Sequence, residues 1–320
     1  MTQPSHATLF TGLDPPTHGL RTNGSFALDT GIDTLAAQLR AAGFATAAFV
    51  GALVLESQFG LSRGFDLYDD RMEALGGGGI GLPERPADAV VDAAIHWLET
   101  APERFFLFVH FFDPHKPYAP RSRVARLRTA SLYDAEISHA DAQLGRLLEA
   151  IDRRFDDGGT LMVVTSDHGE SLGEHGEPTH SYGIYDATQR VPLILAGPGV
   201  PAGVVVERVT RLADVAPTIL SLAGVAPLAD AYAKLHEHLM LDAVVLVDGG
   251  TDSLMRGDEV GLGTPAEDVA SMAAVSASNI PRQYLVCIGF GIDTFHGVCH
   301  SQFLEAVADI TRLGGFLGVT

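Results

Sequence analysis

Short apolar runs alternate along the first 225 residues with segments whose apolar residues recur at helical spacing. Continuous apolar runs, which are typical of strands covered on both faces, occupy residues 45–50, 104–112, 160–165 and 191–196. Apolar residues at helical spacing occupy residues 2–12, 34–42, 87–99, 133–153 and 214–223. Because the two patterns alternate, we predict an α/β fold with a doubly wound sheet for this part of the chain.

A second pattern of the same kind begins near residue 228. It predicts strands at 243–247 and 284–289 and helices at 232–238, from 265, and at 302–311. The change of character near residue 227 predicts two domains, 1–227 and 228–320. This second segment has the order expected of a βαβ unit.

Composition narrows the classes of protein and partner. The chain has 320 residues, 46% of them hydrophobic and 19% charged, which indicates a folded globular protein. Its net charge of −19 disfavours nucleic acid or an anionic membrane as the main partner.

The longest apolar run, 105–109, is far shorter than the roughly 20 residues of a spanning helix, and no signal peptide is readable, so we expect no membrane segment and a cytoplasmic location. The two cysteines, Cys287 and Cys299, provide no disulfide framework, and the oligomeric state stays open.

Three loops carry polar side chains where open α/β sheets bind ligands. Thr2 begins a predicted helix and is a candidate nucleophile whose oxygen would also bind a divalent cation, or it is a simple N-cap. Asp167 and His168 follow a predicted strand and are candidate metal ligands, or a capping carboxylate beside a hydrogen-bonded histidine. The remaining candidates are His115, Lys116, His175 and His180. They could bind an anionic ester oxygen or protonate a leaving group, or they could be surface residues without such a role.

Several motifs in order resemble the sulfatase-like hydrolases of the alkaline phosphatase superfamily. They are TQPSHATLFTG at residues 2–12, then PPTHG, HFFDPHKPYAP, YDAEISHADAQLGRLL, TSDHGESLGEHG and RVPLILAGPG. The resemblance runs from about Thr2 to Val225. It implies an alkaline phosphatase-like fold and metal-dependent hydrolysis of a small-molecule sulfate or phosphate ester.

The resemblance also assigns roles to residues. Thr2 stands at the nucleophile position and His6 at the position of the family's arginine. Threonine cannot become formylglycine, so the chain is similar to the branch with a threonine nucleophile, which includes phosphodiesterase-like members. Asp167 and His168 match the metal-binding pair; calcium sulfatases carry Asp-Asn there, so the histidine favours zinc or manganese. The resemblance places His115 and His180, with Lys116 beside them, against the sulfuryl or phosphoryl oxygens.

One departure from the family concerns the start of the chain. Family members begin with a strand that ends in metal-binding aspartates, and this strand is not found before Thr2. We therefore expect a truncated domain with an incomplete metal cage. A non-catalytic remnant or interaction module is the alternative function. An exposed N-terminal Thr2, as in N-terminal nucleophile hydrolases, is a further alternative.

The second segment resembles a family of uncharacterised function with a Rossmann-like core, so we expect a partial Rossmann-like domain fused to the first. Gly261, Gly263 and Ala266 fit G-x-G-x-x-A, which makes a nucleotide-binding module a weaker alternative, although the acidic loop would repel a pyrophosphate. A second set of residues has the spacing of zinc ligands: His296, Cys299 and His300. The alternative is that they are packed or capping residues without a metal.

Overall fold

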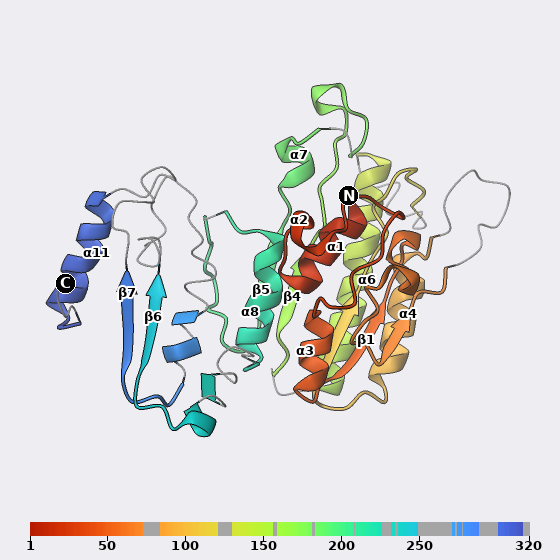
Figure 1. Cartoon of the computed structure of the whole chain (residues 1–320). Coiled ribbons are helices and arrows are strands. Elements are labelled where there is room, and N and C mark those ends of the chain that lie inside the picture. Colours follow the sequence, from red (N-terminus) through yellow and green to blue (C-terminus); the bar gives the residue numbers. More distant parts are fainter. Residues whose placement is uncertain are drawn as a thin grey trace. The chain divides into compact units, whose positions relative to one another are not determined.

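The computed structural model (Figure 1) describes the chain apart from a set of short segments. The segments outside the description are residues 73–83, 121–129, 156–158, 181–182, 208, 226–231, 234–235, 249–270, 273, 277, 288–299 and 316–320. The chain divides into two compact units, Met1–Val225 and Ala226–Thr320. The predicted domain boundary near residue 227, the glycine-rich motif 261–266, and His296 and Cys299 lie outside the described residues, and the side chain of His300 does too.

The elements of the first unit follow the predicted alternation. Its helices are α1 (Thr2–Thr11), α2 (Pro15–His18), α3 (Leu35–Ala41), α4 (Ala87–Leu98), α6 (Leu132–Arg154), α7 (Asp186–Gln189) and α8 (Val215–Leu222). Its strands are β1 (Ala45–Phe49), β2 (Leu67–Asp69), β3 (Phe105–Val109), β4 (Met162–Thr165) and β5 (Leu193–Ala196). Short 3₁₀ turns are η1 (Leu53–Leu55), η2 (Ser57–Phe59), η3 (Glu174–Gly176) and η4 (Leu212–Asp214). The predicted strands and helices of this unit are thus confirmed, while β2 was not predicted because it has only three residues.

Local sequence explains several helix ends. Thr34 and Ser131 cap α3 and α6 by accepting hydrogen bonds from the N–H groups of Ala37 and Asp134. Gly12 ends α1 in the left-handed conformation, with φ of 71°. The interpretation of Thr2 as an N-cap is wrong: Met1 precedes the helix, and Thr2 is its first residue.

Among the described residues of the first unit, the strands form two separate sheets rather than the single doubly wound sheet that we predicted. Parallel strands β2-β1-β3 make one sheet, and β4 pairs with β5 in antiparallel register, with Thr165 opposite Leu193. All positions of β3 and β4 are half-buried, and Ile194 of β5 is 53% exposed. An apolar run predicts that a strand is covered, but it carries no information about the partner strand or its direction, so the sequence could not distinguish the two arrangements.

Helices cover both faces of the β2-β1-β3 sheet. Alternate residues of β3 point to different clusters, with Phe105, Leu107 and Val109 packing beside α4 and Phe106 packing beside α3 and α8. Helices α4 and α6 lie side by side (Figure 1). This layering places the start of α1 near the carboxyl ends of β3 and β4, where ligands bind in open α/β sheets.

The second unit contains a small parallel sheet. Strands β6 (Val244–Asp248) and β7 (Gln283–Cys287) pair with Val244 opposite Gln283, and helix α11 spans His300–Arg312. The described residues of this unit form this sheet and helix α11, and the Rossmann-like core stays a prediction. Within the described residues, no helix is long and apolar enough to cross a membrane.

Candidate active site

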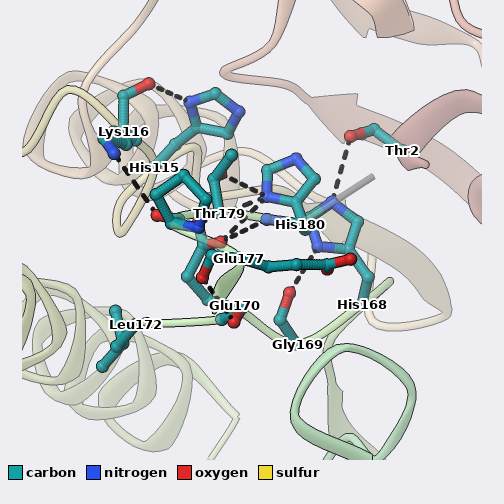
Figure 2. A network of polar contacts seen from close by, with 12 residues as sticks. Thr2, His115, Lys116, His168, Gly169, Glu170, Leu172, Glu177, Thr179 and His180 are labelled. Carbon is teal, nitrogen blue, oxygen red and sulfur yellow. Dashed lines mark hydrogen bonds and ion pairs between the residues drawn. The ribbon is translucent and has the colours of Figure 1, made fainter. Parts of the chain in front are cut away.

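Three segments that are far apart in the sequence bring polar side chains together in the first unit. The start of α1 contributes Thr2 and His6, the segment after β3 contributes His110 and His115, and the segment after β4 contributes Asp167, His168, Glu170 and His180. Figure 2 shows the imidazoles of His168, His180 and His115 following one another between Thr2 and Lys116. We call these residues, together with Lys116, the histidine cluster.

The hydroxyl of Thr2 faces an imidazole nitrogen of His168. The distance between Thr2 Oγ1 and His168 Nε2 is 3.4 Å (Figure 2). Nδ1 of His168 lies 2.9 Å from the carbonyl oxygen of Gly169, and because a carbonyl only accepts, Nδ1 carries the hydrogen. Nε2 is therefore the ring nitrogen that faces the Thr2 hydroxyl.

Asp167 is a half-buried carboxylate among histidines, and its Oδ2 is fully buried. Its Oδ2 lies 3.3 Å from His168 Nε2 and 3.8 Å from His6 Nδ1, and it has no hydrogen-bond partner among the described residues. Burial opposes ionisation, but His6 and His168 outweigh it, so the pKa of Asp167 is lowered and the carboxyl is ionised at neutral pH. The site thus holds a negative charge beside His168, whose Nε2 also faces the Thr2 hydroxyl.

His6 is buried within the first unit. It is 4% exposed, and its Nδ1 donates to the Thr2 carbonyl oxygen at 2.8 Å. Its ring packs edge-on against Phe108 and His110. His6 therefore fixes the first turn of α1, on which Thr2 is carried.

A carboxylate orients His180. Glu170 Oε1 accepts the backbone N–H of His180 at 2.7 Å, and Glu170 Oε2 lies 3.2 Å from His180 Nδ1. The His180 ring stacks on His168 with centroids 4.1 Å apart. Burial lowers the pKa of His180, His168 lowers it further, and Glu170 opposes this shift. The Nδ1 hydrogen is held by Glu170, so Nε2 is the nitrogen available to a ligand.

His115 completes the row of imidazoles. Its Nδ1 donates to the Lys116 carbonyl at 2.7 Å, and its ring stacks on Phe112 and meets His180 edge-on. Burial and the neighbouring His180 lower its pKa. The ammonium of Lys116 donates to the carbonyl of Pro178 at 3.3 Å, which joins the loop after β3 to the loop after β4 (Figure 2).

One predicted residue lies apart from this set. His175 is exposed, has a positive φ of 56°, and stacks on Tyr185. Its predicted role in substrate binding gains no support from this position.

Two members of the histidine cluster were not predicted. His110 follows β3 directly, and burial, with the neighbouring His6, lowers its pKa to about 3, so its ring is neutral. The one feature of the sequence that could have indicated His110 is its position as a single histidine within an otherwise apolar run. Glu170 follows His168 by two residues, and its spacing in the chain gave no indication that it pairs with His180.

The donors next to Thr2 fit part of a divalent metal site. One buried carboxylate oxygen without a hydrogen-bond partner and one imidazole lone pair are ligands that zinc and manganese accept. The described residues contain no group of three His, Cys, Asp or Glu side chains that could hold a metal ion. Asp167 and His168 thus fit as two ligands of such an ion.

Comparison with known proteins identifies the family of the first unit. The model of the sulfatase family matches residues 1–225. The chain belongs to the sulfatase family. Human arylsulfatase K is 36% identical over 95 residues, and the choline-sulfatase of Rhizobium meliloti (strain 1021) is 38% identical over 100 residues. These matches cover 30% and 31% of this chain but only 18% and 19% of the relatives.

Solved structures show the same fold. The phosphonate monoester hydrolase of Agrobacterium radiobacter superposes with a TM-score of 0.55 at 24% identity, over 70% of this chain and 64% of the other. BT4656, solved in complex with its substrate D-glucosamine-2-N,6-O-disulfate, gives 0.55 at 20% identity over 70% of this chain and 67% of the other. A sulfatase-like α/β fold is thereby confirmed for the first unit. Residues 196–320 match a protein family of unknown function, DUF1152.

Proposed function

We propose that the first unit hydrolyses a sulfate or phosphate ester, with Thr2 as the nucleophile. The observation that carries this proposal is the approach of Thr2 Oγ1 to Nε2 of His168, at 3.4 Å. Sulfatase and phosphonate hydrolase relatives support the ester class. The substrate is a small anionic ester, because the histidine cluster offers several imidazole nitrogens and one ammonium group.

The reaction begins at the Thr2 hydroxyl. Thr2 Oγ1 forms a bond to sulfur or phosphorus while the bond from that atom to the ester oxygen breaks, and the hydroxyl proton passes through solvent to the departing ester oxygen. Water then cleaves the threonine ester: its oxygen joins the released sulfate or phosphate, and one of its hydrogens restores the Thr2 hydroxyl. His6 contributes by holding the first turn of α1, so that Oγ1 keeps its direction.

His115 and His180 hold the oxygens that surround the reacting atom. Each ring has its Nδ1 hydrogen committed to the protein, so Nε2 faces the ligand. A neutral Nε2 cannot donate, so binding of an anionic oxygen is accompanied by uptake of a proton at these rings. Lys116 adds a positive charge at the edge of the histidine cluster. His175 remains a proposed contact to the distal part of a substrate.

Enzymes of this family generally depend on a divalent metal ion. Asp167 and His168 would hold the ion next to Thr2, with zinc or manganese favoured over calcium because one ligand is an imidazole. When bound, the ion lowers the pKa of the Thr2 hydroxyl.

Substitution of Thr2 tests the proposal. Thr2→Ala should lower kcat at least about 100-fold for 4-nitrophenyl sulfate or 4-nitrophenyl phosphate, measured with zinc or manganese present. Thr17→Ala on α2 is the control, because Thr17 is exposed and should leave kcat unchanged. Equal kcat for Thr2→Ala and the parent, or a parent that turns over neither ester, would contradict the proposal and favour a non-catalytic role.

A further inference from the structure

Glu136 of α6 is the most deeply buried carboxylate that the proposed mechanism does not use. It is 4% exposed and lies on the face of α6 that also buries His139 and Gln143. One oxygen, Oε1, accepts the backbone N–H of Ala119. The other, Oε2, is buried without a hydrogen-bond partner among the described residues.

The Ala119 contact ties α6 to the loop that carries two proposed ligand-binding residues. This loop, residues 113–120, holds His115 and Lys116 and leaves the sheet after β3. Its other end is fixed by Asp113, whose Oδ2 accepts the N–H of Ala87 at the start of α4 at 2.9 Å. The loop is thus fastened at one end to α4 and at the other end to α6.

A small cavity separates these attachments, and mainly acidic groups face it. The segment before α4 contributes Glu84 and Arg85, the loop contributes Asp113 and His115, and α6 contributes Glu136. Arg85 does not neutralise Glu136, because it pairs with Asp69 at 3.2 Å. His139 lies one turn further along α6, 3.8 Å from Asp88, and Tyr118 approaches Glu136 from the loop. Glu136 therefore shares this cavity with the carboxyl groups of Glu84 and Asp113, and the one cation that the cavity's lining contributes, Arg85, is paired with Asp69.

We propose that Glu136 is a positioning residue of the proposed hydrolase, and that it holds loop 113–120 closed against α6 when its carboxyl group carries a proton. A neutral carboxyl still accepts from Ala119 at Oε1, and it avoids the cost of burying a charge on Oε2, which has no hydrogen-bond partner among the described residues. An ionised Glu136 places a second negative charge beside Asp113 and Glu84, which loosens the loop. Burial raises the pKa of Glu136 to about 7, aided by Asp113 and Glu84 and opposed by the N–H groups of Ala119 and His115.

Hydrogen exchange of the whole chain tests this role without reference to activity. The loop contains three prolines, which have no amide hydrogen, so only a few amides of the loop report on exchange. The amide of Ala119 is one of these reporters. In the parent, protection of residues 113–120, corrected for intrinsic rates, should fall about tenfold between pH 6 and pH 8. Glu136→Gln mimics the neutral carboxyl and should keep the protection at both pH values, whereas Glu136→Ala should lose it at both. Glu149→Gln on the exposed side of α6 is the matched control and should behave as the parent.

Kinetics supply the link to the proposed function, on which the role of this residue rests. Glu136→Ala should raise KM for the anionic ester several-fold with a smaller change in kcat, and Glu136→Gln should abolish the rise in KM between pH 6 and pH 8. A Glu136→Gln variant that keeps the pH dependence of loop protection of the parent would overturn the inference. A parent without ester turnover would contradict the proposed function alone, since the exchange measurement still decides the role of Glu136.

Discussion

At the scale of single residues, the direction of each imidazole is set by what binds its Nδ1. Carbonyl groups hold Nδ1 of His168 and His115, and Glu170 holds Nδ1 of His180. In each case the second nitrogen is left to face the histidine cluster. Such fixed tautomers cost no reorganisation when a ligand arrives, which is how preorganised sites bind anions and metal ions.

Glu170 gives the first prediction at this scale. Glu170→Gln removes the charge that holds His180, so kcat/KM for the ester should fall about tenfold, the equivalent of one weakened charge-assisted hydrogen bond. Steady-state kinetics with 4-nitrophenyl phosphate measure the change. Asp186→Asn, an exposed residue at the start of α7, should leave kcat/KM at the value of the parent. An unchanged Glu170→Gln would show that packing alone orients His180.

Metal content provides the second prediction. Elemental analysis of the purified chain should find zinc or manganese in the parent, and Asp167→Ala should reduce its affinity at least about 100-fold because a charged ligand is lost. Chelation should remove ester hydrolysis, and added zinc or manganese should restore it. Hydrolysis that survives chelation would instead indicate that His168 Nε2 accepts the Thr2 proton as a general base.

At the scale of elements, the contact between α4, α6 and the loop after β3 combines packing with a titratable group. Apolar residues of α4, such as Val90 and Val91, are fully buried in the cluster that also contains Leu147 of α6. Polar groups close the same interface near Glu136, where Arg85 and Asp69 form an ion pair. The packing sets the position of α6, and the polar groups connect it to the site.

Stability against pH tests this interface. The pKa of Glu136 is about 7 in the folded chain, above its ordinary value of 4.5, so the folded state binds the proton more tightly. Its contribution to the free energy of unfolding is therefore fully present below pH 4.5 and is lost as the pH rises to 7. Glu136→Gln should remove this loss and raise the free energy of unfolding at pH 8 by up to about 3 kcal/mol. Urea unfolding at pH 5 and pH 8 measures it, and an equal gain at both pH values would contradict a titration of Glu136 as the cause.

At the scale of the whole molecule, a strongly acidic chain carries the site that we propose for an anionic ester. The net charge is −19, and the histidine cluster combines the ammonium of Lys116 with the carboxylates of Asp167 and Glu170 and with several imidazoles. The field of the protein therefore repels an anionic ester at long range, and only contacts at short range attract it. The second unit adds to the acidic charge, and its match is to a family of unknown function.

Salt dependence tests this balance. Raising ionic strength from about 10 to 150 mM shortens the screening length from roughly 30 to 8 Å, so kcat/KM should rise several-fold. The rise should be steeper for 4-nitrophenyl phosphate than for 4-nitrophenyl sulfate, since the phosphate ester carries more negative charge. A fall of kcat/KM with salt would show that the local charge of the histidine cluster outweighs the net charge of the chain.

The sequence by itself determined the order of the elements and the identity of most chemical groups. Apolar runs predicted β1, β3, β4 and β5, and helical spacing predicted α3, α4, α6 and α8, because burial periodicity and capping residues such as Thr34 are local properties. Ordered motifs were enough to indicate the sulfatase family, to which the chain belongs. Thr2, Asp167, His168, His115 and His180 were named because their side-chain chemistry is written in the sequence.

Only the tertiary structure decided how these groups meet. The strands lie in two sheets instead of the predicted one, and the Thr2 hydroxyl faces His168. His175 lies away from the histidine cluster and stacks on Tyr185. The tertiary structure also added His110, Glu170 and Glu136, whose pKa values and partners come from burial and from residues distant in the chain. Distances across the fold, and the low dielectric that burial creates, depend on long-range packing, which no local pattern of residues encodes.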